Sequence, residues 1–169
     1  MTALPPWATP NFSLHFDNIQ LTSQGPTVHW MVAHMNLTYH LVTLMMCKSK
    51  ITTPGTISKA RSVRYAGKLQ ESAYYVTYVV GLFLRDNPNF GHVGPYICTC
   101  IFEAGLAWLT LTRISPDPML VSQCDQSLVL LIRALDNIGR FFIVAQNQKE
   151  ILEKLRMSRF AVKQGATSR

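Results

Sequence analysis

Apolar residues recur at steps of three and four along much of this chain, which is the spacing of one face of an α-helix. The first such segment starts at Pro26-Thr27 and predicts a helix over 27–48. Its apolar face consists of Trp30, His34, Leu37, Leu41, Leu44 and Met45. Its opposite face carries His29, Asn36, His40, Thr43 and Cys47, so the helix is amphipathic and needs a core to cover its apolar side.

Further segments repeat this pattern between turn-rich connections. A helix from Ser58 to about Arg85 has a stripe made of Leu69, Ala73, Val76, Val80 and Phe83. A helix over 95–113 has a stripe made of Ile97, Ile101, Ala104, Trp108 and Leu111, and its Ala104, Gly105 and Ala107 allow another helix to approach closely. A last pair, with a bend near 137–139, holds Leu128, Leu131, Leu135, Ile138, Phe142, Ala145, Ile151, Leu152 and Leu155.

No segment alternates between apolar and polar residues as a half-buried strand does. We therefore predict an all-α fold: a single helical domain of about five helices, packed as antiparallel helix hairpins. With 169 residues, 48% of them apolar, the chain suits one domain of ordinary size. We expect a flexible or surface-laid arm over 1–25, a helical domain over 26–158 and a disordered basic tail over 159–169.

The net charge of +7 is concentrated in two clusters, one over residues 59–68 and one over residues 154–169. Attraction to nucleic acid or to anionic lipid is one interpretation. Solvated helix faces and basic tails are the commoner explanation, so charge alone predicts no DNA binding. The opening MTALPPWATP lacks a basic region followed by a long apolar run, and we therefore expect a cytosolic or nuclear protein without a secretory signal.

The candidate chemistry is sparse. The four cysteines lack the paired spacing of a zinc site and are predicted to be reduced, buried thiols. Histidines 29, 34 and 40 are five and six residues apart, whereas two ligands on one helix usually lie four apart, so we predict no metal site. His40 is expected to form a hydrogen bond to a neighbouring helix or loop.

Glu103 is the only carboxylate in the apolar run from Tyr96 to Leu111. Such an acid can be a general base with a raised pKa, but no partner acid, histidine or nucleophile lies nearby in the sequence. Pairing with an arginine or with a helix end is therefore the favoured expectation. The same residue argues against a membrane span here, because a bilayer needs roughly 20 apolar residues and a central charge is costly.

Read in order, the helical segments resemble the C-terminal part of the fungal-specific transcription factor domain, the helical middle homology region of fungal zinc-cluster regulators. The resemblance covers about residues 27–157. The matching residues are Leu37, Tyr39 and His40 in the first helix, Ser72 and Ala73 in the second, Pro95, Ala104 and Gly105 in the third, and Phe142 and Ala145 in the last pair. It implies that these ten are packing residues and that the chain lies in the nucleus. Apart from the resemblance, we expect a cytoplasmic protein.

The chain also departs from that family. Cys47-Lys48, Leu69 and Trp108 stand where the family often has other residues, and no six-cysteine zinc cluster is present in the sequence. The resemblance therefore implies a truncated regulatory module without catalytic residues, metal or cofactor, and does not support direct DNA contact. We expect a protein partner or self-association and no membrane insertion.

Two alternatives remain open on the sequence alone. One is a small helical accessory protein or enzyme of secondary metabolism, in which His34, His40 and Glu103 would converge in one pocket. The other is a multi-span membrane protein, because residues 96–112 are almost continuously apolar.

Overall fold

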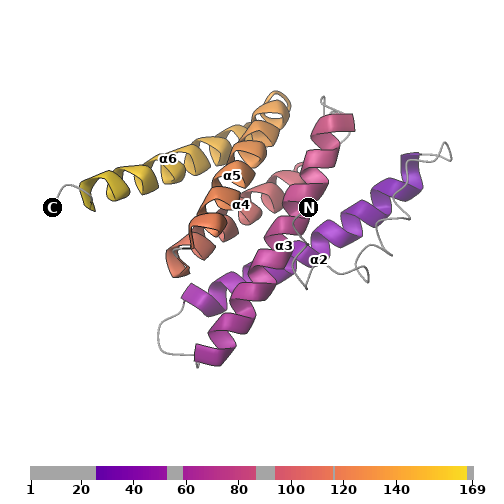
Figure 1. Cartoon of the computed structure of the whole chain (residues 1–169). Helices are drawn as coiled ribbons and strands as arrows, with labels where there is room; N and C mark the ends of the chain where they lie inside the picture. Colours follow the sequence, from indigo (N-terminus) through magenta and orange to yellow (C-terminus); the bar gives the residue numbers. More distant parts are fainter. Residues whose placement is uncertain (1–25, 53–58, 87–93, 116, 167–169) are drawn as a thin grey trace, which may run out of the picture. The chain divides into compact units, whose positions relative to one another are not determined.

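The computed structural model describes residues 26–52, 59–86, 94–115 and 117–166. These ranges form five α-helices and contain no strand (Figure 1). The helices are α2 (Pro26–Thr52), α3 (Lys59–Asp86), α4 (Tyr96–Ile114), α5 (Pro118–Gly139) and α6 (Ile143–Ala166). The predicted all-α class is confirmed. The expected arm over 1–25 lies outside the described residues, as do the side chains of His29 and Trp30.

The chain divides into two compact units, Met1–Met35 and Asn36–Arg169. The boundary lies within α2 rather than at residue 25, where we expected it. The second unit contains α2 from Asn36 onward and the whole of α3, α4, α5 and α6. At its far end, α6 continues to Ala166, beyond the predicted domain boundary at residue 158.

Side-chain contacts show that α5 and α6 run in opposite directions. Asp136 near the end of α5 contacts Lys149 near the start of α6, at 2.6 Å. Asp125, further back along α5, contacts Arg156, which is further forward along α6. This inverse order defines an antiparallel hairpin, and the backbone N–H groups of Phe141 and Phe142, which both donate to Ile138 O, close its turn.

The core of the second unit is centred on α4, which packs against α3, α5 and α6. The whole predicted stripe of α4 is buried, namely Ile97, Ile101, Ala104, Trp108 and Leu111. The predicted stripes of α3 and α5 are buried as well, apart from the half-buried Phe83 of α3. Phe142, in the turn after α5, is also half-buried. Helical periodicity identified these faces correctly because each is continuously covered by a neighbouring helix. In α6, Leu152 is buried, but Ile151 is exposed and was wrongly placed in the core.

Gly105 of α4 lies directly against Leu152 of α6. A Cβ atom added to Gly105 would lie 2.7 Å from Leu152 Cδ1 and 2.9 Å from Leu152 Cδ2. The buried Leu152 side chain occupies the space that any larger residue at 105 would need. The prediction that small residues on α4 admit a neighbouring helix is therefore confirmed at this position.

The covered face of α2 includes Leu37, Leu41 and Leu44, as predicted, but its edges differ from the prediction. His40 and Cys47, which we assigned to the polar face, are buried together with Leu37, Leu41 and Leu44. Met45, which we assigned to the apolar face, is exposed. Apolar and polar residues mix at the edges of this face, so periodicity identified its centre but not its limits.

α4 is also the one helix in the described ranges that is long and apolar enough to cross a membrane, judged by length and composition alone. In the structure, 56% of its apolar 18-residue segment is buried inside the protein. Core helices of soluble proteins meet the same criterion.

Candidate functional site

His40 joins α2 to α3 inside the second unit. Its Nδ1 lies 3.2 Å from Ser72 Oγ, and its ring stacks on that of Tyr75 with centroids 3.9 Å apart. The predicted hydrogen bond to a neighbouring helix is therefore present. With only 3% of its surface exposed, His40 is poorly placed to exchange protons with a substrate in solvent.

Burial favours the uncharged imidazole. Desolvation lowers the pKa of His40 from 6.5 to about 4, because the charged ring would lose its water shell. The side chain is thus neutral at physiological pH. It acts as a polar contact within the core rather than as a charge.

Two consecutive hydrogen bonds connect α4 to α3 inside the core. Trp108 Nε1 donates to Thr77 Oγ1 over 3.0 Å, and Thr77 Oγ1 donates to the carbonyl of Ala73 over 2.7 Å. These two bonds satisfy the buried indole N–H and fix the orientation of the Thr77 side chain. Thr77 also lines a surface groove, so the chain of hydrogen bonds links the core to the surface.

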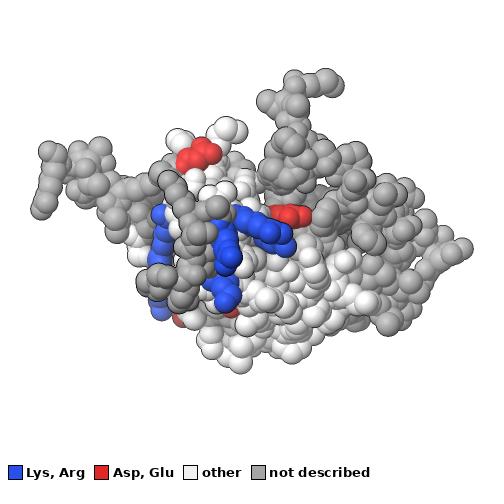
Figure 2. Space-filling view, turned by 90° about the horizontal axis from the view of Figure 1, so that it is seen from below, with Lys and Arg blue, Asp and Glu red and all other residues white. Residues whose placement is uncertain are grey.

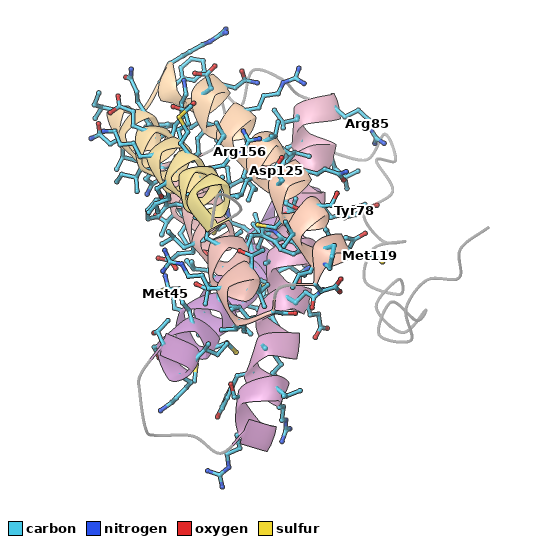
Figure 3. The ribbon with its side chains drawn as sticks, turned by 60° about the vertical axis from the view of Figure 1, so that its left-hand side comes forward. Met45, Tyr78, Arg85, Met119, Asp125 and Arg156 are labelled. Carbon is cyan, nitrogen blue, oxygen red and sulfur yellow. The ribbon has the colours of Figure 1, made fainter. Side chains whose placement is uncertain are left out.

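This groove lies between α3 and α5 and has a volume of about 370 Å³. It is open to solvent, so a ligand bound there would keep an exposed side. Its lining residues are mostly aromatic, aliphatic or uncharged polar: Tyr74, Thr77, Tyr78, Gly81, Leu82, Arg85, Gln123, Gln126, Ser127 and Leu130. Tyr78 and Arg85, from α3, lie along one side of the molecule together with Met119 of α5 (Figure 3).

The described lining of the groove offers groups that bind ligands. Among these residues, Arg85 carries the one ionic group, and none is an acid, a histidine or a cysteine. Tyrosine faces and glutamine amides can hold a ligand by stacking and hydrogen bonds, and an arginine favours an anionic group. Sequence reasoning missed this site. A signal existed, because Tyr74, Tyr78, Leu82 and Arg85 follow one another at helical steps on the less buried side of α3.

Glu103 forms an ion pair with Lys48, which links α4 to α2. The favoured expectation of an arginine or a helix end as its partner was wrong; the cation is a lysine of another helix. Both side chains are less than a quarter exposed, so solvent screens the pair only in part.

Two of the residues required by the enzyme alternative, His40 and Glu103, contact different partners in the second unit. His40 faces α3, whereas Glu103 contacts Lys48, which lies about 12 Å further along α2 at the rise of an α-helix. His34 is exposed and belongs to the first unit. Among the residues that the structure describes, no three His, Cys, Asp or Glu side chains are grouped so that they could hold a metal ion.

All four cysteines are free and buried, as predicted. Desolvation raises the pKa of the Cys100 thiol to about 11 and raises the pKa of Cys98. It also raises the pKa of Cys47, although nearby Lys68 partly opposes this effect. Thiolate is the reactive form, so these three thiols are poor nucleophiles at neutral pH.

The ten residues that carry the family resemblance fall into three groups. Two of them, His40 and Ser72, contact each other directly across α2 and α3. Leu37, Ala73, Ala104, Gly105 and Ala145 are buried. Phe142 is half-buried, while Tyr39 and Pro95 are exposed and therefore do not contribute to the core.

Comparison with known proteins adds no relative: no protein-family model, no curated protein and no solved structure matches this chain.

Proposed function

We propose that this chain is a non-catalytic, transcription-regulator-like helical module that acts by binding an effector or a protein partner. One observation carries the proposal. The described side chains most capable of chemistry, His40, Glu103 and the cysteines, are engaged in packing or ion pairing. The open groove between α3 and α5, in contrast, presents tyrosines, amides and one guanidinium.

The order of motifs along the helices is the second support. It resembles the regulatory domain of fungal zinc-cluster regulators, and we propose a nuclear location on that basis. The chain contributes binding, and DNA contact would come from another protein or segment.

The groove offers a way to transmit binding to the core. A ligand that contacts both α3 and α5 would bind one arrangement of the two helices more tightly than another. Only such a difference in affinity can shift the population of two states. Thr77 lines the groove and accepts the hydrogen bond of buried Trp108. A shift of α3 against α5 would therefore change the surroundings of this hydrogen bond.

A tethered reporter tests this function. The full chain is fused to an unrelated DNA-binding domain, and expression of a reporter gene carrying its target sites is measured in a fungal host. Gly81→Trp fills the groove, and we expect it to change reporter expression. Gly67→Trp is the matched control, because it lies on the same helix in open space, where an added Cβ atom would meet nothing within 4 Å.

Two results contradict the proposal. One is equal reporter expression with and without the tethered chain. The other is an untethered, fluorescently tagged chain that remains outside the nucleus. Circular dichroism of both variants ensures that a changed signal reflects the groove and not unfolding.

A further inference from the structure

The solvent side of α2 carries an unusual apolar surface. Tyr39, Val42, Met45 and Met46 are 63%, 49%, 51% and 61% exposed. Tyr39, Val42 and Met46 follow one another at steps of three and four, so they form a seam along the helix opposite its buried face. We call these four residues the outer α2 face.

No charge interrupts this seam. α2 contains no Asp, Glu, Lys or Arg before Lys48. Single exposed apolar residues are common on protein surfaces, but adjacent ones on consecutive turns mark a site of interaction. The heptad-like spacing is the one by which a helix packs against another helix.

Basic side chains gather at the end of the second unit where α2 finishes and α3 begins. Lys50, Arg61, Arg64 and Lys68 are all exposed. Figure 2 views the molecule from the end where α2 finishes and α3 begins, and Lys and Arg side chains cluster there. Lys68 is close enough to Cys47 of α2 to affect its pKa, which places this part of α3 beside the end of α2. We call these four residues the basic end.

The basic end is poorly neutralised by the protein itself. Within the described ranges, no salt bridge joins any of its four residues to an acid. Glu71, one turn after Lys68, is the nearest acid along α3 and is half-buried. Glu103 already pairs with Lys48. A partner that brings acidic groups to this end would therefore gain electrostatic energy.

We propose that the outer α2 face and the basic end together bind an amphipathic helix of another protein. The apolar side of that helix packs along Tyr39, Val42 and Met46, and acidic residues at one of its ends meet the basic end. This inference rests on the proposed function, since it assigns a protein partner to the module.

The distribution of charged and apolar residues favours an amphipathic helix over a second copy of the chain, nucleic acid or a membrane. A second copy of the chain would bring another net charge of +7 to a surface that is already basic at one end. Nucleic acid would satisfy the basic end but would leave the apolar seam uncovered. An anionic membrane fits a helix with basic residues along both edges of its apolar face, whereas here they lie at one end.

A peptide of defined chemistry tests the inference on the full chain. The probe is a fluorescein-labelled synthetic helix of about three heptads, with leucines at the a and d positions and glutamates at one end. Its control carries lysines in place of the glutamates. Fluorescence anisotropy should give tighter binding of the acidic peptide by about tenfold or more, a difference that shrinks as salt is raised.

Variants then locate the contact. Val42→Glu should weaken binding of the acidic peptide by about tenfold, as expected for a charge in a buried seam. Val129→Glu, at a 46% exposed valine of α5, should leave binding unchanged. Arg64→Glu combined with Lys68→Glu should reverse the preference, so that the lysine peptide binds better than the acidic one.

Several outcomes overturn the inference: equal binding of the two peptides, equal effects of Val42→Glu and Val129→Glu, or a dimer in sedimentation that Val42→Glu dissociates. Binding to anionic vesicles or duplex DNA that exceeds peptide binding also overturns it. If peptide binding fails while Gly81→Trp still alters the tethered reporter, the proposed function stands and only this partner is wrong. The reverse pattern identifies a binding face on a protein that does not regulate transcription.

Discussion

The imidazole of His40 and the phenol ring of Tyr75 are stacked, 3.9 Å between centroids with 24° between their planes, and so join α2 to α3. The contact also isolates the imidazole from solvent, so its protonation is coupled to folding. Burial raises the pKa of Tyr75 to about 12, which keeps that partner uncharged as well.

Acid should therefore destabilise the fold through His40. Its pKa is about 4 in the folded protein against 6.5 for a solvated histidine, so the unfolded chain binds the proton first as pH falls. The free energy of unfolding should be highest above pH 6.5 and should fall as the pH drops from 6.5 to about 4. The total decrease that His40 causes is about 3 kcal/mol. Urea unfolding across this range measures the slope. His40→Asn, which keeps a polar contact for Ser72 but does not titrate, should flatten it; an unchanged slope in that variant contradicts the assignment.

Gly105→Ala should destabilise the protein although alanine is the better helix former. The new Cβ would lie 2.7 Å from Leu152 Cδ1, and overpacking of this kind costs about 1–3 kcal/mol against a propensity gain of about 1 kcal/mol. Gly67→Ala, with nothing within 4 Å, should stabilise by up to about 1 kcal/mol. Thermal unfolding measures both. The cost of Gly105→Ala should also shrink in a Leu152→Ala background, because the clashing methyl groups are then absent.

Thr77→Val should cost about 1–3 kcal/mol, because it removes the acceptor of the buried Trp108 indole N–H without creating a cavity. Thr77→Ser is the control, since it keeps the hydroxyl oxygen. Chemical denaturation followed by tryptophan fluorescence reports the difference. Equal stability of the valine and serine variants would mean that the indole finds another acceptor.

The Lys48–Glu103 pair should show measurable coupling in a double-mutant cycle. Glu103→Gln, Lys48→Met and the double variant should give a coupling energy of about 1 kcal/mol, because the pair is partly buried. The exposed Lys154–Glu150 pair, 3.9 Å apart on α6, provides the comparison and should give no measurable coupling. High salt should leave the first coupling largely intact.

Periodicity in the sequence was sufficient for the helices and for the covered faces of α3, α4 and α5. On these helices apolar residues at helical steps occupy one side, so one side alone can be buried favourably. On α2 it identified the centre of the covered face, Leu37, Leu41 and Leu44, but not its edges, where His40 is buried and Met45 is exposed. His40 is buried because α3 supplies partners for its ring, the Ser72 hydroxyl and the Tyr75 side chain.

The sequence by itself determined the all-α class, the small contact surface at Gly105 and the burial of the cysteines, because each depends on local spacing or on residue size. Only the tertiary structure decided the partner of Glu103, the groove between α3 and α5, and the exposure of the outer α2 face. Each of these depends on which helices lie side by side. Helix packing brings together residues from distant parts of the chain, such as Lys48 with Glu103 and Tyr78 with Gln126, and no local sequence pattern encodes that packing.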